Sequence, residues 1–126
     1  MSSNNLDKRV HILVVDDEEM FRDFVAMLLM AYGYEVTCAS DAMSALEACQ
    51  SAHDNFDLVL TDQYMPGLPG DKFAEKVKEV DPSQHVVLMT GGNYELDDAS
   101  AISAMLKKPF TNVAVMDVVE RYTTLH

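Results

Sequence analysis

Five short apolar runs, each with a length typical of a β-strand, alternate along the chain with longer polar or amphipathic segments. The runs lie at residues 10–15, 34–38, 56–61, 85–89 and 104–107. Because they are continuous rather than alternately apolar and polar, they are typical of strands that are buried on both faces of a parallel sheet. Parallel neighbours need crossover connections, so helices should cover both faces. The pattern predicts a single-domain α/β fold of the (βα)5 type.

Apolar residues at helical spacing fill most of the segments between the runs. They predict helices at residues 18–32, 41–52, 70–80 and 111–122. Phe24 should face inward from the first of these helices and Val80 from the third, while Ser40 is the predicted N-cap of the second. The poorly patterned segment at residues 94–103 predicts a short fourth helix between the last two strands.

Composition and charge exclude several classes of protein. A chain of 126 residues is long enough for one core, and a formal net charge of −12 argues against nucleic-acid binding and against anionic membranes. No apolar run approaches the roughly 20 residues that a membrane span requires. The polar start shows no secretory signal, so we expect a cytoplasmic protein. Residues 1–8 should form a flexible N-terminal tail and residues 9–126 the folded domain.

Residues that can carry chemistry follow four of the five predicted strands. Asp16 and Asp17 follow the first, Asp62 the third, Thr90 the fourth and Lys108 the fifth. In doubly wound sheets, binding sites lie beyond the carboxyl ends of the strands. A single aspartate in a turn is common, but all five residues at strand ends are much harder to explain as ordinary turn residues. We therefore expect one shared site.

Three carboxylates so close together need a positive partner. Two carboxylates about 4 Å apart repel by about 4 kcal/mol at a protein-like dielectric. A hard-oxygen cluster suits Mg²⁺, and the metal together with Lys108 would let the site accept a phosphoryl group. One carboxylate could then act as the nucleophile and form an acyl phosphate. Glu18 and Glu19 should instead lie in the first turn of a helix, where the helix dipole favours them.

Four sequence pieces together resemble the receiver domain of two-component response regulators, of which the chemotaxis regulator is an example. They are ILVVDDEE, FDLVLTDQYMPGLPG, LMTGG and LKKPF, and the resemblance covers about residues 9–124. It implies a flavodoxin-like doubly wound sheet with strand order 2-1-3-4-5. It also implies a signalling module that catalyses only its own phosphorylation and dephosphorylation.

The resemblance also implies a metal site. Asp17 and Asp62 would bind Mg²⁺ directly, Asp16 would assist through water, and the backbone carbonyl of Tyr64 would complete the protein ligands. No other cofactor is implied.

For the reaction itself, the resemblance implies that Asp62 is the phosphoacceptor. Thr90 would bond a phosphoryl oxygen, and Lys108 would bridge to the acceptor carboxylate or to the phosphoryl group. The bond between Lys108 and Pro109 would be cis. A histidine kinase or a phosphotransfer protein would donate the phosphoryl group, and the product would bind a downstream protein that the sequence does not name. Whether the domain forms a homodimer stays open.

The sequence departs from the family pattern in three places. Met105 stands where members commonly carry an aromatic switch residue, and the segment between Thr90 and Lys108 is short, so the fourth helix should be shortened. Tyr64 and Gly92 occupy positions that influence how water reaches the acyl phosphate in the family. A bulky Tyr64 predicts an altered phosphate lifetime.

Three other functions remain as alternatives. A pseudo-receiver would bind partners without phosphorylation, although such domains usually lack part of the acid, threonine and lysine set. A Mg²⁺-dependent phosphatase of the haloacid dehalogenase type carries a D-x-D arrangement after its first strand, whereas Glu18 stands two residues after Asp16 here. An FMN binder would need a phosphate loop there, and four successive acids would repel the phosphate.

Overall fold

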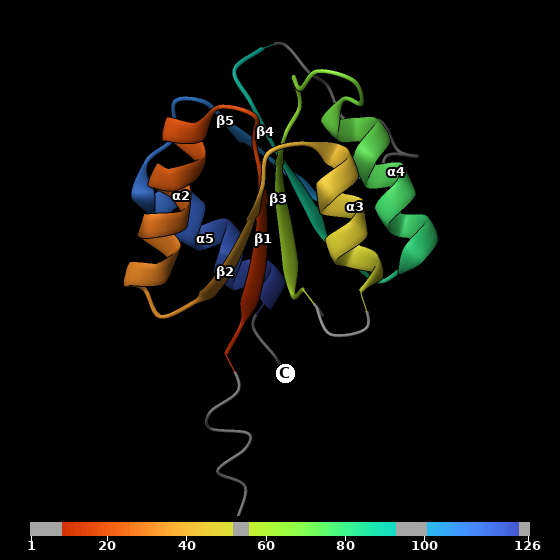
Figure 1. The fold of residues 1–126 in the computed structure, drawn as a ribbon. Helices are drawn as coiled ribbons and strands as arrows, with labels where there is room; N and C mark the ends of the chain where they lie inside the picture. Colours follow the sequence, from red (N-terminus) through yellow and green to blue (C-terminus); the bar gives the residue numbers. More distant parts are fainter. Residues whose placement is uncertain (1–8, 52–55, 93–100, 124–126) are drawn as a thin grey trace, which may run out of the picture.

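A computed structural model describes residues 9–51, 56–92 and 101–123. Its sheet has five parallel strands in the order β2-β1-β3-β4-β5, as the resemblance implied (Figure 1). The strands are β1 (His11–Val15), β2 (Glu35–Ala39), β3 (Leu58–Asp62), β4 (Val86–Thr90) and β5 (Ala104–Lys107). The predicted α/β class and the positions of all five strands are therefore confirmed.

Four helices in the described part of the chain cover the two faces of the sheet. They are α2 (Glu19–Ala31), α3 (Ala42–Gln50), α4 (Gly70–Val80) and α5 (Asn112–Thr123). In Figure 1, α2 and α5 lie on one face, and α3 and α4 lie on the other. The predicted tail and most of the predicted short helix at residues 94–103 lie outside the described residues, so both stay predictions.

The core consists of two layers, one on each face of the sheet. Along β1, Ile12 and Val14 point toward the layer that includes α2 and α5, whereas Leu13 and Val15 point toward α3 and α4. Every residue of β3 and β4 is buried. Burying one such aliphatic side chain contributes about 1.5–3 kcal/mol. The buried central strands therefore hold the residues at their carboxyl ends in fixed positions.

Three local predictions were wrong. Asp41, not Ser40, caps α3, because its Oδ1 accepts a hydrogen bond of 2.8 Å from the Ser44 N–H. Phe24 is 50% exposed, whereas Val25 and Leu29 of the same helix are buried, so the buried stripe of α2 is narrower than the predicted one. Val80 is 42% exposed because it is the last residue of α4. No helix in the described ranges is both long and apolar enough to cross a membrane.

Candidate functional site

The carboxyl ends of the central strands bring the predicted residues to one edge of the sheet. Asp16 directly follows β1, while Asp62 and Thr90 are the last residues of β3 and β4. Since β1, β3 and β4 are neighbours, these residues end adjacent strands. Lys108 follows β5, and its N–H donates a 2.8 Å hydrogen bond to the Thr90 carbonyl. This bond fixes the start of the lysine side chain beside the acids.

The three predicted aspartates form one cluster. Asp16, Asp17 and Asp62 each offer a carboxylate oxygen, and these oxygens all lie within 4.8 Å of one another. Asp16 is fully buried and Asp62 is 7% exposed, whereas Asp17 is exposed at the mouth. Oxygen-only ligands with an open side suit Mg²⁺, which keeps several of its waters. The acidic triad is therefore typical of a Mg²⁺ site.

One lysine only partly neutralises these carboxylates. Lys108 Nζ lies 3.5 Å from Asp16 Oδ2 and 3.5 Å from Asp62 Oδ1. Three carboxylates against one ammonium leave an excess of two negative charges when all are ionised. Burial raises the pKa of the Asp62 carboxyl above its usual range; Lys108 opposes this rise and Asp16 adds to it. The excess negative charge of the cluster favours binding of a divalent cation.

Local hydrogen bonds set the direction of the buried Asp16. Its Oδ1 accepts a 2.9 Å bond from the Glu18 N–H, and its carbonyl accepts a 2.8 Å bond from Arg22 Nη1. The first bond turns the chain from β1 into α2. Glu18 is the N-cap residue and Glu19 begins the helix, so both acids lie near the positive end of its dipole as predicted.

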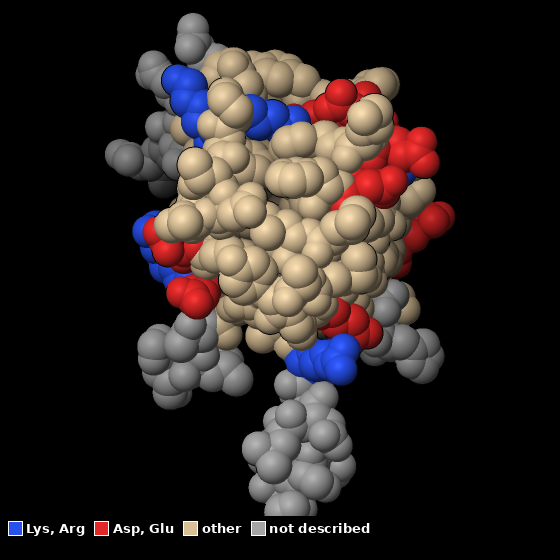
Figure 2. Space-filling view, turned by 90° about the vertical axis from the view of Figure 1, so that its left-hand side faces the viewer, with Lys and Arg blue, Asp and Glu red and all other residues tan. Residues whose placement is uncertain are grey.

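Figure 2 shows the face of the molecule that α2 and α5 form. A group of acidic side chains lies in its upper part, the end at which the strands terminate in Figure 1, and basic side chains lie at the same edge. Most of the remaining face carries no charge. Further acidic and basic side chains lie at the left-hand and lower edges, so the middle of this face is uncharged and its edges carry the charge.

Gln63 contributes to the site, and the sequence reasoning missed it. It directly follows Asp62, and its buried side chain accepts a 2.9 Å hydrogen bond from the Asp71 N–H in the first turn of α4. Its carbonyl accepts a further 2.9 Å bond from the Gly70 N–H. A Cβ atom at Gly70 would collide with the Asp62 carbonyl, so α4 is held directly against the end of β3. Only the approach of α4 reveals this role.

Tyr64 lies over the glycine that follows β4. A Cβ atom added at Gly92 would be 2.8 Å from the Tyr64 hydroxyl oxygen and 3.1 Å from its Cε2. The ring is 58% exposed. The Gly92 N–H donates a 3.1 Å hydrogen bond to Thr90 Oγ1. The absence of a side chain at residue 92 therefore lets the ring lie close to the end of β4.

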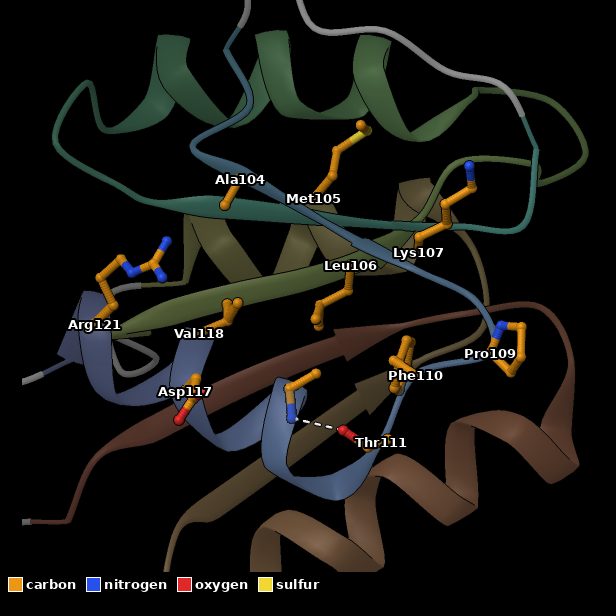
Figure 3. A pocket seen from close by; sticks show the side chains of 11 residues that line it. Ala104, Met105, Leu106, Lys107, Pro109, Phe110, Thr111, Asp117, Val118 and Arg121 are labelled. Carbon is orange, nitrogen blue, oxygen red and sulfur yellow. Dashed lines mark hydrogen bonds between the residues drawn. The ribbon is translucent and has the colours of Figure 1, made fainter.

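A separate pocket of about 520 Å³ lies between β5 and α5 (Figure 3). Met105 lines it together with Leu106 and the residues that follow β5. Phe110 and Thr111 form one end of this lining, and Thr111 Oγ1 accepts a 3.0 Å hydrogen bond from the Ala114 N–H. The pocket is distinct from the acid cluster but shares the connection that carries Lys108.

The model of the response regulator receiver domain family matches residues 12–120. The chain is 34% identical to the response regulator receiver protein CpdR of Brucella abortus over 103 residues, which cover 79% of this chain and 84% of that protein. It is 32% identical to the transcription factor SKN7 of Candida albicans over 108 residues, and so spans 82% of its own length but only 19% of that protein.

A solved structure agrees with these matches. The response regulator protein TrrA of Thermotoga maritima, in complex with Mg²⁺-BeF, superimposes with a TM-score of 0.80 at 29% identity. The match covers 90% of this chain and 98% of that one. Fold, acidic triad and matches agree, and the chain belongs to the response regulator receiver domain family. It is a two-component signalling module rather than an enzyme.

Family membership decides against two of the three alternatives that the sequence left open. The chain is a receiver domain, and neither a phosphatase of the haloacid dehalogenase type nor an FMN binder. Its pocket of Asp16, Asp17 and Asp62 is consistent with a phosphoacceptor aspartate and a Mg²⁺ site. The bond between Lys108 and Pro109 is cis, as the resemblance implied. A histidine kinase is the expected class of partner.

Proposed function

We propose that the chain is the phosphoacceptor domain of a two-component or phosphorelay system and that Asp62 receives the phosphoryl group. The carrying observation is the buried Asp62 carboxylate, 3.5 Å from Lys108 Nζ, within a cluster that also holds Asp16 and Asp17. Phosphoryl transfer depends mainly on in-line positioning and on neutralisation of charge. Asp62 ends a central strand and lies within ion-pair distance of Lys108. Asp17 is exposed and has no ion pair with Lys108 among the described contacts.

In the proposed reaction, an oxygen of the ionised Asp62 carboxylate attacks the phosphorus atom. The new oxygen–phosphorus bond forms while the bond from phosphorus to the donor nitrogen breaks, and the electron pair leaves with that nitrogen. The product is an acyl phosphate. The Lys108 ammonium offsets the negative charge of the transferred phosphoryl group, and the Thr90 hydroxyl donates a hydrogen bond to one of the phosphoryl oxygens. Water later cleaves the acyl phosphate and returns the carboxylate.

The same carboxylates are proposed to hold the metal. Asp17 and Asp62 would bind Mg²⁺ directly, Asp16 would assist through water, and the Tyr64 backbone carbonyl would complete the protein ligands. The cluster of carboxylate oxygens within 4.8 Å supports the first three assignments. When bound, Mg²⁺ offsets the charge of the phosphoryl oxygens.

A protein donor fits the surface around the site. Met20, Phe24 and Met27 are 83%, 50% and 66% exposed along α2, which begins beside the acids. Such apolar surface suits protein contact. We propose a histidine kinase or a phosphotransfer protein as donor, a change in binding of a downstream protein as output, and the cytoplasm as the compartment. The two free cysteines are in keeping with a reducing compartment.

The test is the intact mass of the protein after incubation with acetyl phosphate. Wild type, Asp62→Asn and Asp81→Asn are compared, each with Mg²⁺ and with EDTA. Asp81 is a matched control because it is an exposed aspartate at the C-terminal end of α4, whereas the opposite end of that helix lies against Asp62. We expect one phosphoryl adduct in wild type and in Asp81→Asn, present with Mg²⁺ and absent with EDTA. Asp62→Asn should show no adduct.

An adduct that persists in Asp62→Asn would disprove the assignment of the acceptor. If wild type forms none with acetyl phosphate, phosphorylated phosphotransfer proteins and histidine kinases replace it as donors. Failure with all three donor classes, despite measurable Mg²⁺ binding, would favour the remaining alternative, a pseudo-receiver that binds partners without phosphorylation.

A further inference from the structure

Lys108 has a third neighbour besides the two carboxylates. Its Nζ lies 4.0 Å from the centroid of the Phe21 ring, while Asp16 Oδ2 and Asp62 Oδ1 are each 3.5 Å away. The ammonium is thus held between an aromatic face and two acids. The lysine side chain is 23% exposed, so this contact is largely shielded from water.

Phe21 is itself held in place from a different element. It is the third residue of α2 and is half-buried. Its ring makes an edge contact with Phe110, with centroids 5.6 Å apart and planes at 67°. Both rings pack against the core layer beneath α2 and α5. Phe110 braces one side of the Phe21 ring, whose face is then available to the lysine.

The two carboxylates by themselves do not fix the ammonium strongly. Distances of 3.5 Å exceed the 2.7–2.9 Å that is typical of charge-assisted hydrogen bonds, so they leave the lysine room to move. A lysine also carries a flexible four-carbon chain that loses rotamer freedom when it is ordered. An aromatic face attracts a cation through its quadrupole, and partial burial strengthens that attraction. Phe21 can therefore order a group that the acids alone would leave mobile.

We propose that Phe21 is a positioning residue for phosphoryl transfer, because its ring face holds the Lys108 ammonium in the acid pocket where the phosphoryl group arrives. This inference rests on the proposed function and adds a residue to it. Phe21 touches neither the metal ligands nor the phosphoryl group in this scheme and acts only through Lys108. An aliphatic side chain at residue 21 would fill the same space without attracting the cation.

The matched variants are Phe21→Leu, which removes the ring, and Phe21→Tyr, which keeps it. The measurement is the rate of adduct formation at increasing acetyl phosphate with saturating Mg²⁺, with the unfolding midpoint recorded in parallel. We expect the maximal rate of Phe21→Leu to fall about threefold to tenfold, the range that a partly buried cation–π contact supports. Phe21→Tyr should stay within about twofold of wild type on the same grounds.

A double-mutant cycle separates positioning from packing. In the Lys108→Met background the ammonium is gone, so Phe21→Leu should cause no further loss of rate. A purely structural role would instead lower the unfolding midpoint in both backgrounds and slow both to the same extent. If Phe21→Leu is unfolded at the assay temperature, Phe21→Met replaces it, because the flexible methionine fills irregular space.

Three results would overturn the inference. They are an unchanged rate in Phe21→Leu, an equal loss in Phe21→Tyr, and an undiminished loss in the Lys108→Met background. If wild type forms no adduct with any donor, the proposed function fails and this inference fails with it. A normal wild-type adduct together with any of the three results removes Phe21 alone and leaves the assignment of Asp62 in place.

Discussion

Aspartates at two kinds of position in this domain have opposite properties. Asp41 and Asp81 lie at a helix start and in a turn, where their carboxylates accept hydrogen bonds from Ser44 and Ser83. These bonds lower the pKa of both carboxyls, so their ionised forms favour the fold. Asp62 lies at the end of a buried strand, and there burial raises the pKa of its carboxyl. The same residue type thus supports the fold at one position and opposes it at another.

This difference indicates where the function lies. At Asp41 and Asp81 the bonds from local N–H and hydroxyl groups lower the pKa of an exposed carboxyl and account for the residue within its own turn. At Asp62 the effect of burial and of the nearby Asp16 outweighs the backbone hydrogen bond from Gln63 and the attraction of Lys108, so the pKa of its carboxyl is raised. An unfavourable charge of this kind is common at functional sites. In this domain it occurs where a metal and a phosphoryl group would compensate for it.

The largest expected difference between the aspartates of the acid cluster and those in turns and helix caps concerns Mg²⁺ affinity. Asp17→Asn should weaken Mg²⁺ binding by at least about tenfold, since even residues one shell removed from a metal typically cost 10- to 100-fold. Asp81→Asn should leave the affinity unchanged. Isothermal titration of Mg²⁺ into each protein measures this. Equal affinities in all three proteins would mean that the acid cluster is not the metal site.

The sequence was sufficient for most of the acid pocket. Continuous apolar runs identified the strands, and Asp62, Thr90 and Lys108 could be placed together because parallel strands end at a common edge. It was not sufficient for Phe21 or Gln63. Their roles depend on how α2 and α4 approach the sheet and on side-chain rotamers, which no spacing along the chain records.

The helix caps and exposed faces were harder to predict for a related reason. Asp41 and Ser40 are adjacent and both residue types are good N-caps, so a difference of one residue in the helix start decides between them. Phe24 belongs to the apolar stripe of α2 by spacing, but the helix has more apolar residues than the sheet can cover. Periodicity identifies a helix and its orientation only approximately.

The next prediction concerns stability in the absence of metal. Asp62→Asn should raise the free energy of unfolding in EDTA at pH 7, because it removes a buried charge whose pKa is raised. A raised folded-state pKa means that the wild type loses stability as the pH rises from the unfolded value, about 3.9, through the folded value. The advantage of the variant should therefore be complete above that window and disappear below it.

Urea unfolding of both proteins at a series of pH values measures this effect. Asp57→Asn is a control, because Asp57 is exposed and its carboxylate accepts a hydrogen bond from the His11 N–H. A variant at residue 62 that is less stable than wild type at pH 7 would show that the buried carboxylate supports the fold, and the contrast between the two groups would be lost.

A smaller effect is expected from Tyr64, which lies near the mouth of the acid pocket. Tyr64→Asn should shorten the lifetime of the acyl phosphate about twofold to fivefold, as expected for a barrier change below about 1 kcal/mol. The ring is close to Gly92 at the end of β4 and can limit the approach of water to Asp62. Decay of the phosphorylated protein, followed by intact mass after removal of the donor, measures the lifetime. An unchanged decay rate would make Tyr64 an exposed side chain without a kinetic role.

The smallest effect is expected at the turn aspartate. Asp81→Ala removes the acceptor for the N–H and hydroxyl of Ser83, bonds of 3.0 Å and 2.7 Å. We expect a loss of about 0.5 kcal/mol, because exposure to solvent weakens the contribution of such bonds. The pKa of Asp81 is lowered in the fold, so its contribution should be present above the unfolded value and disappear as the pH falls through the folded value. This is the opposite pH dependence to that of Asp62. Urea unfolding of Asp81→Ala and Asp62→Asn at pH 7 and at pH 3 compares these pH dependences. If both variants changed stability in the same direction, burial and hydrogen bonding would not distinguish the two carboxylates.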